Sequence, residues 1–306
     1  MSRQFRTSFA TLAIAATSML TDVCFAAEKL TVTASFSILG DLVRVVGGDR
    51  VVVNTLVGPN QDAHVFEPRP EDVKTIIRSR LLVANGLGFE PWMDRLAKAA
   101  DYKGVILHAS TGVTPRVPSG KSGKSANSQA AADPHAWQSP VNVATYVDNI
   151  ATALTQLDPA NGATFTANRV AYIQELSALD QWIKAQIAPL PKEKRRVITS
   201  HDAFGYFADQ YEVSFMAPVG VSTQTEASAK DVALLIRLIK REKIKAVFME
   251  NMNDPKLLLQ LSKEAGVVPG AALYSDALSS ASQPGATYLQ MMRHNVSHLV
   301  RGLKQN

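Results

Sequence analysis

The sequence predicts an α/β protein built on mainly parallel β-sheets flanked by helices. Short apolar runs alternate with amphipathic, helix-like segments along most of the 306 residues, a pattern typical of parallel strands that are joined by helices. One stretch without internal proline, residues 160–188, spaces its apolar side chains as a single long helix does. About 280 residues would remain after removal of an N-terminal leader, which is enough for two modest domains.

The first residues have the layout of a cleavable signal peptide. An apolar run from Phe9 to about residue 20 follows two arginines and precedes a group of small residues. The run is too short to span a bilayer. Residues 21–23 lack the leucine and small side chains that precede a lipidated cysteine. We therefore expect cleavage near Ala26, which removes residues 1–26 and releases a soluble periplasmic protein.

Composition excludes several classes of site. Cys24 is the only cysteine, so the mature chain would have no disulfide, no thiolate metal site and no cysteine nucleophile. Any metal must be held by nitrogen and oxygen.

Loss of the leader removes two arginines and one aspartate from a chain of net charge +5, which leaves a mildly basic surface. Basic runs interleaved with aromatic residues are absent from the sequence, so we expect no nucleic-acid partner.

Four strands and three helices are expected in the first part of the chain. Gly47 and Gly48 end the first helix, and Pro70 and Pro91 are placed as first-turn prolines of the next two. The predicted strands are residues 30–34, 51–57, 81–84 and 104–108.

Residues 114–132 are rich in serine, glycine, lysine and alanine and have almost no bulky apolar side chain. We expect a mobile surface loop there. The loop contains Gly-Lys-Ser twice, at Gly120 and Gly123, but neither copy has the earlier glycine of a phosphate-binding loop. The sequence therefore disfavours nucleotide binding.

Two helices follow this loop. Ser139 and Pro140 are expected to cap and begin a helix that ends near residue 157. Asp158 and Pro159 begin a second helical segment that runs to about Ala188. Thirty helical residues would be roughly 45 Å long, which is long enough to cross from one domain to another.

The alternation of strands and helices resumes after Pro191. Ser228 is expected to cap a helix, Pro255 to begin another, and Gly266 to end it. A last helix begins near Ala286. The predicted strands are residues 197–200, 245–249 and 271–274.

The placement of histidines predicts a metal site. His64 lies just past a predicted strand, His135 precedes the cap at Ser139, and His201 and Asp276 each follow a strand. Ligands in open α/β sheets bind beyond the carboxyl ends of strands, so these four side chains can converge. Three neutral imidazoles and one carboxylate are a donor set well suited to tetrahedral zinc. An all-carboxylate set would favour calcium or magnesium.

The residues alone leave alternatives open at each of these positions. The ligand spacings match no local zinc motif, and position alone favours solvated loop histidines at 64 and 135. For His201 the alternative is an N-cap neighbour, and for Asp276 it is an ordinary turn aspartate. Glu250, at a strand end, either orients a histidine or takes part in a helix cap. His294 and His298 are four apart on a helix, where a solvated face is the favoured interpretation. His108 is assigned no special role.

Four segments resemble the metal-ligand segments of the zinc and manganese substrate-binding proteins of ABC transporters. The resemblance runs from about Leu30 to the C-terminus. It implies two α/β lobes joined by one long rigid helix, with the metal in the cleft between the lobes. The segments are GPNQDAHVFEPRPE (58–71), DPHAWQSP (133–140), HDAFGYF (201–207) and LYSD (273–276).

On this resemblance the first lobe is residues 27–157, the linker helix residues 158–190 and the second lobe residues 191–306. His64 and His135 would come from the first lobe, and His201 and Asp276 from the second. Manganese-selective members usually place a glutamate where His201 stands, so the histidine favours zinc. Many zinc members carry a histidine-rich loop between the first two ligands, and residues 114–132 contain no histidine.

The resemblance implies a high-affinity zinc receptor that delivers the metal to a membrane permease with a cytoplasmic ATPase. We expect a monomer and no enzymatic activity, and leave open whether a chaperone loads the metal. Two alternatives are a manganese or iron receptor of the same fold and a zinc hydrolase with Glu250 as general base. A fourth ligand at Asp276 argues against the hydrolase, because catalytic zinc normally keeps one position open.

Overall fold

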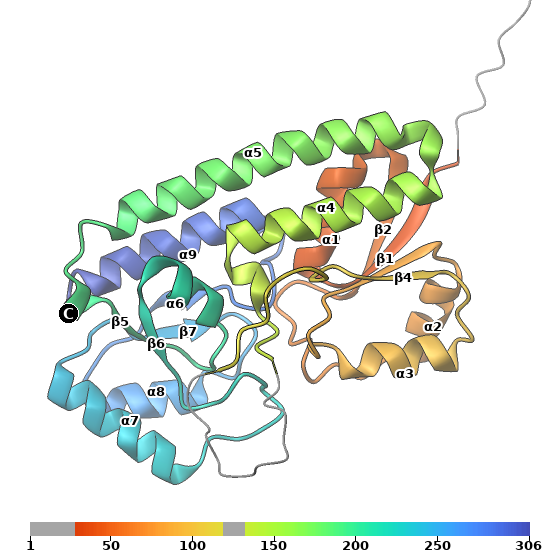
Figure 1. Ribbon diagram of the computed structural model, residues 1–306. Coiled ribbons are helices and arrows are strands. Elements are labelled where there is room, and N and C mark those ends of the chain that lie inside the picture. Colours follow the sequence, from red (N-terminus) through yellow and green to blue (C-terminus); the bar gives the residue numbers. More distant parts are fainter. Residues whose placement is uncertain (1–27, 119–131) are drawn as a thin grey trace, which may run out of the picture.

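The computed structural model describes residues 28–118 and 132–306 (Figure 1). The predicted signal peptide, residues 1–26, and most of the predicted loop 114–132 lie outside the described residues. The fold class is confirmed: parallel sheets are flanked by helices, and one helix is much longer than its neighbours. None of the helices in the two described ranges is both long and apolar enough to cross a membrane.

The first half of the chain forms a parallel sheet with strand order β2-β1-β3-β4. Strand β1 lies inside the sheet and is almost wholly buried. Val32, Ala34 and Phe36 share one face of it, whereas Thr33 and Ser35 are buried on the opposite face, where they form hydrogen bonds with Ser79 and Glu90. Helices α1 and α4 cover one face of the sheet, and α2 and α3 lie on the other side (Figure 1). The strands are β1 (Leu30–Phe36), β2 (Val51–Val57), β3 (Leu81–Ala84) and β4 (Val105–His108). The helices are α1 (Ser37–Gly47), α2 (Pro70–Ile77), α3 (Pro91–Ala99) and α4 (Pro140–Leu157).

The second half forms two parallel strand pairs, β5-β6 and β7-β8, which a bridge between Ile198 and Val247 joins edge to edge. Helices α7 and α8 pack together on this sheet, and α6 and α9 lie toward the long helix (Figure 1). The strands are β5 (Arg196–Ile198), β6 (Ser214–Met216), β7 (Phe248–Glu250) and β8 (Gly270–Leu273). The helices are α6 (Gly205–Tyr211), α7 (Ala229–Glu242), α8 (Lys256–Ala265) and α9 (Tyr288–Leu303).

Helix α5 (Gly162–Ile187) connects the two halves and has 26 residues, or roughly 39 Å at 1.5 Å per residue. It packs against α1 and α4 of the first half and against α6 and α9 of the second (Figure 1). One continuous apolar cluster extends from Leu30 to Leu303 through this helix. The helix is therefore held along its length by both halves of the molecule.

Several expected elements differ in the structure. The strand predicted at 245–249 is β7, which begins three residues later. Asn306 Oδ1 accepts hydrogen bonds from the backbone N–H groups of Lys245 and Ala246, so these groups do not join a strand ladder. Helix α6 and strand β6, which have seven and three residues, were not predicted. Ser139 stands at the N-cap of α4, but its side chain makes no capping hydrogen bond.

Candidate metal centre

Four loops at the carboxyl ends of strands bring the predicted ligands to one point. His64 lies in a turn after β2, and His135 immediately precedes the short 3-10 turn Ala136–Gln138. His201 follows β5, and Asp276 follows β8. Side chains that are about 70 positions apart in the sequence therefore meet where the two halves of the molecule face each other.

The distances between donor atoms are those of a small coordination cage. His64 Nε2 lies 3.3 Å from His135 Nε2 and 3.3 Å from Asp276 Oδ2. Asp276 Oδ2 is 3.0 Å from His201 Nε2, and its Oδ1 is 3.6 Å from His135 Nε2. All four ligand atoms lie within 4.8 Å of one another. A tetrahedron with metal-to-donor distances of about 2.0–2.1 Å has donors about 3.3 Å apart, so the cage fits a zinc-sized ion.

The cage is closed to water. The exposed fraction of His64 is 4%, and the other three ligands are fully buried. Phe89 packs against the ring of His64 and Trp137 against that of His135, with centroids 4.7 and 5.2 Å apart. Asp276 Oδ1 is buried and accepts no hydrogen bond from any described residue. A buried carboxylate oxygen without a donor is costly, and a bound cation would satisfy it.

Two carboxylates contact the Nδ1 atoms of His201 and His135, on the side of each ring that faces away from the cage. Glu250 Oε2 lies 2.6 Å from His201 Nδ1, and its Oε1 accepts hydrogen bonds from the backbone N–H groups of Ser200 and His201. Asp133 Oδ1 lies 2.8 Å from His135 Nδ1 and accepts the His135 backbone N–H. Each contact leaves the ring's Nε2 directed toward the cage. Of the two alternatives that the sequence left for Glu250, its contact with the His201 ring favours the orienting role over a helix cap.

The orienting role of Asp133 was missed. Its signal in the sequence is the Asp-Pro-His order, in which an aspartate two residues before a histidine can bond both the backbone and the ring. Asn253 was also missed: its Nδ2 lies 3.4 Å from His201 Nδ1, but nothing in the local sequence marks this contact.

Opposite charges in the cage shift the pKa values of its members. Burial alone would lower the pKa of His135, but Asp276 and Asp133 raise that pKa to about 9. Burial would also lower the pKa of His201, but the charges of Glu250 and Asp276 raise that pKa well above its usual range. Burial would raise the pKa of Asp276, but the two histidines hold it well below its usual range. These shifts favour protonated histidines in the metal-free cage, so binding of a divalent cation would release protons.

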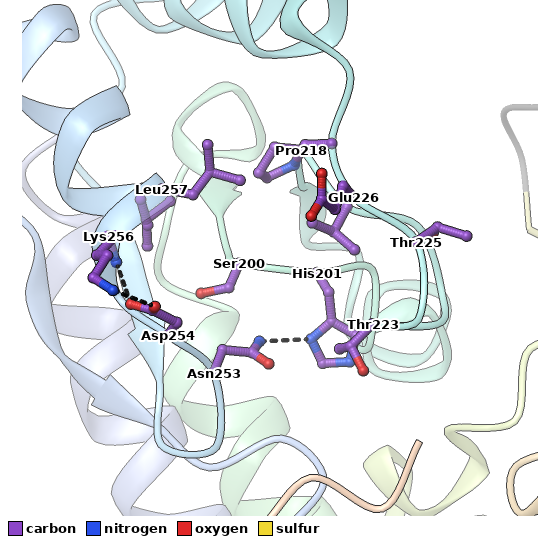
Figure 2. Close-up of a pocket in the computed structure, with 13 residues that line it drawn as sticks. Ser200, His201, Pro218, Thr223, Thr225, Glu226, Asn253, Asp254, Lys256 and Leu257 are labelled. Atoms are coloured by element: carbon purple, nitrogen blue, oxygen red, sulfur yellow. Dashed lines mark hydrogen bonds and ion pairs between the residues drawn. The ribbon is translucent and has the colours of Figure 1, made fainter. Parts of the chain in front are cut away.

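A cavity of about 410 Å³ borders the outer edge of His201 (Figure 2). Figure 2 shows Asn253 directed at the His201 ring and the loop from Pro218 to Glu226 on the opposite wall. The same loop crosses to the first half of the molecule, where Thr223 Oγ1 donates to Asp62 Oδ2 and Gln224 Nε2 donates to the His64 carbonyl, both at 2.7 Å. The loop thus fastens the two sides of the cage.

The remaining histidines lie elsewhere. The His294 and His298 rings on α9 are 4.4 Å apart, and His294 Nε2 contacts the Ala272 carbonyl. His108 lies at the end of the edge strand β4. These three are not among the four clustered ligands.

Residues 32–302 match the family model described as "Zinc-uptake complex component A periplasmic". The chain belongs to this family. Members of the zinc-uptake component A family are metal-binding receptors of ABC transporters, which work with a membrane permease and an ATPase. They are not enzymes, so the hydrolase alternative is wrong.

Relatives within the family differ in the metal that their names give. The manganese-binding lipoprotein MntA of Halalkalibacterium halodurans is 30% identical and covers 91% of this chain and 90% of its own. The iron-binding protein YfeA of Yersinia pestis is 31% identical over 91% of this chain and 88% of its own. The structure of the periplasmic zinc-binding protein TroA of Treponema pallidum is similar at a TM-score of 0.82, with 29% identity over 90% of this chain and 99% of its own.

Proposed function

We propose that this receptor captures Zn²⁺ between His64, His135, His201 and Asp276 and delivers it to the permease for import. The observation that carries the proposal is the cage of three imidazole nitrogens and one carboxylate oxygen, whose atoms lie within 4.8 Å of one another, with His64–His135, His64–Asp276 and His201–Asp276 contacts of 3.0–3.3 Å. Imidazole donors favour zinc over manganese, and the intrinsic affinity of such sites also rises from manganese through iron to zinc.

One observation supports manganese or iron as the alternative cargo. Asp276 Oδ1 has no hydrogen-bond donor among the described residues and lies 3.6 Å from His135 Nε2. If both carboxylate oxygens bound one ion, the coordination number would exceed four, which suits manganese or iron better than tetrahedral zinc. The names of the two relatives described as manganese-binding and iron-binding agree with this alternative.

Metal analysis of the protein purified from the periplasm tests the choice of cargo. We expect one zinc per chain, and in competition with equal free concentrations of manganese and ferrous iron we expect zinc to remain bound. A matched variant, His201→Glu, replaces one imidazole by a carboxylate and should shift the preference toward manganese. Purification with manganese or iron at one per chain, and retention of that metal against zinc, would contradict the zinc proposal.

We propose that the mature protein begins after cleavage near Ala26 and is soluble in the periplasm. Relatives include proteins named lipoproteins, so lipid attachment at Cys24 is the alternative. Mass spectrometry of the mature N-terminus separates the two. An unmodified residue from the Ala26–Ala27 region supports cleavage, and a diacylated Cys24 would contradict it.

A further inference from the structure

Arg116 lies at the junction of the two halves of the molecule, outside the set of four ligands. Its side chain is only 16% exposed. Its Nη1 lies 3.1 Å from Asp133 Oδ2, and its Nε lies 2.9 Å from Asp209 Oδ2 on α6. One guanidinium therefore joins a fully buried carboxylate of the first half to a carboxylate of the second half.

Asp133 divides its two oxygens between Arg116 and His135. Oδ1 contacts the ring and the backbone N–H of His135, whereas Oδ2 contacts the guanidinium. The carboxylate cannot rotate without breaking one of these contacts. The orientation of the His135 ring thus depends on the position of the guanidinium.

The local backbone is built to hold this arrangement. The Asp133 N–H donates to the Arg116 carbonyl at 2.7 Å. The Tyr206 hydroxyl accepts from the Arg116 N–H at 2.9 Å and lies 3.2 Å from the Asp133 carbonyl. Gly205, the first residue of α6, leaves the necessary space, because a Cβ there would collide with Arg116 Nη1 and Asp133 Oδ2.

We propose that Arg116 is a positioning residue for metal capture, which holds the Asp133 carboxylate against His135 and fastens it to α6 through Asp209. The proposal rests on the proposed metal site. A metal-bound His135 is neutral, so without Arg116 the buried Asp133 carboxylate would face no positive partner among the groups that contact it. Loss of partners that orient metal ligands typically weakens metal binding by about 10–100-fold.

The first experiment measures zinc dissociation constants and dissociation rates by chelator competition at fixed pH. Arg116→Gln is compared with Arg169→Gln, which breaks an ion pair with Asp148 that has no contact with the site. We expect Arg116→Gln to weaken zinc binding by about 10-fold or more, and Arg169→Gln to stay within about twofold of the unmodified protein. Equal affinities in the two variants would overturn the proposal.

A double-mutant cycle with Asp133→Asn distinguishes positioning from general stability. If Arg116 acts through Asp133, the double variant should bind zinc about as weakly as Asp133→Asn alone. If instead the fold-losses of zinc affinity in the two single variants multiply in the double variant, Arg116 acts independently of Asp133, and the proposal is overturned. The free energy of unfolding of each metal-free variant is measured in parallel. A purely structural role of Arg116 would lower that free energy, but the effects of the Arg116 and Asp133 substitutions on zinc affinity would then be independent of each other.

Arg116→Lys keeps the test decisive if Arg116→Gln does not fold by circular dichroism. A lysine retains the charge but cannot contact two carboxylates through separate nitrogens of a planar fork, so we expect an intermediate loss of affinity. Unchanged affinity in Arg116→Lys, with Arg116→Gln unfolded, would overturn the proposal. An error in the metal-site proposal would be recognised separately, because the unmodified protein would then bind zinc no better than its His64→Ala variant.

Discussion

At the scale of single residues, the atoms that we propose as metal ligands are separate from the atoms that orient the rings. Nε2 of each of the three histidines faces the carboxylate of Asp276 or another ligand. Nδ1 of His135 and of His201 faces Asp133 and Glu250. Carboxylates in these places favour the neutral tautomer with the proton on Nδ1 and make each Nε2 a better metal ligand.

Removing single ligands should have graded effects. His64→Ala, His135→Ala and His201→Ala should each weaken zinc binding by about 100-fold or more, because each removes one of four proposed ligands of the ion. Asp276→Ala should weaken binding without abolishing it, since three imidazoles remain. Isothermal titration with a competing chelator measures these constants. Full zinc retention in His135→Ala would count against the assignment of the site.

Glu250→Gln tests the orienting contact on His201. The amide oxygen can still accept from the Ser200 and His201 backbone N–H groups, but the amide nitrogen would then face Nδ1 and favour the wrong tautomer. We expect zinc affinity to fall by about 10–100-fold, whereas Glu264→Gln on the exposed face of α8 should have no effect. Equal zinc affinities in the two variants would argue against this role for Glu250.

Zinc affinity should depend on pH. The pKa of His135 is raised to about 9, so its metal-free ring is protonated at neutral pH and zinc must displace that proton. For each unit by which the pH falls below 9, the zinc dissociation constant should rise by about tenfold for each displaced proton. Chelator competition between pH 6 and pH 9.5 measures the slope. Affinity that does not change over this range would contradict protonation of the metal-free cage.

The stability of the metal-free protein should have the opposite pH dependence. A folded-state pKa above the unfolded value of about 6.5 contributes stability that is complete below pH 6.5 and is lost as the pH rises through about 9. Asp276 is ionised in both states over this window, so it does not oppose the trend. Urea unfolding in the presence of a chelator should therefore show lower stability at pH 9.5 than at pH 6.5.

At the scale of elements, α5 and the loops at the strand ends have different tasks. We propose that residues 27–157 and 191–306 form two lobes and that residues 158–190 limit their movement to a small rocking. The packing of α5 against helices of both halves supports this proposal. By contrast, the loop 218–226 holds the cage partly through hydrogen bonds of Thr223 and Gln224 that rocking would break.

Hydrogen exchange with and without zinc tests this division. Residues 162–187 should be strongly protected in both states, because α5 is packed along its length. Residues 218–226 should become more protected when zinc binds. An unprotected α5 in the metal-free protein would contradict the rigid connection.

At the scale of the whole molecule, apolar periodicity in the sequence predicts the alternation of strands and helices, because it is a local signal. The four residues of the cage were predicted in two steps: His201 and Asp276 stand just after strands, whereas His64 and His135 were selected by the resemblance of their segments to a known family. The exceptions depend on distant contacts. Asn306 decides where β7 begins from about 60 positions away, and Arg116 reaches Asp209 on α6. Neither contact has a local pattern from which it could be predicted.

The most direct test of the account is anomalous diffraction at the zinc edge from crystals of the zinc-loaded protein. We predict one peak in the cleft, about 2.0–2.2 Å from Nε2 of His64, His135 and His201 and from an oxygen of Asp276. A peak at another place, or a cage with no peak in a protein that carries one zinc per chain, would contradict zinc binding by these four residues.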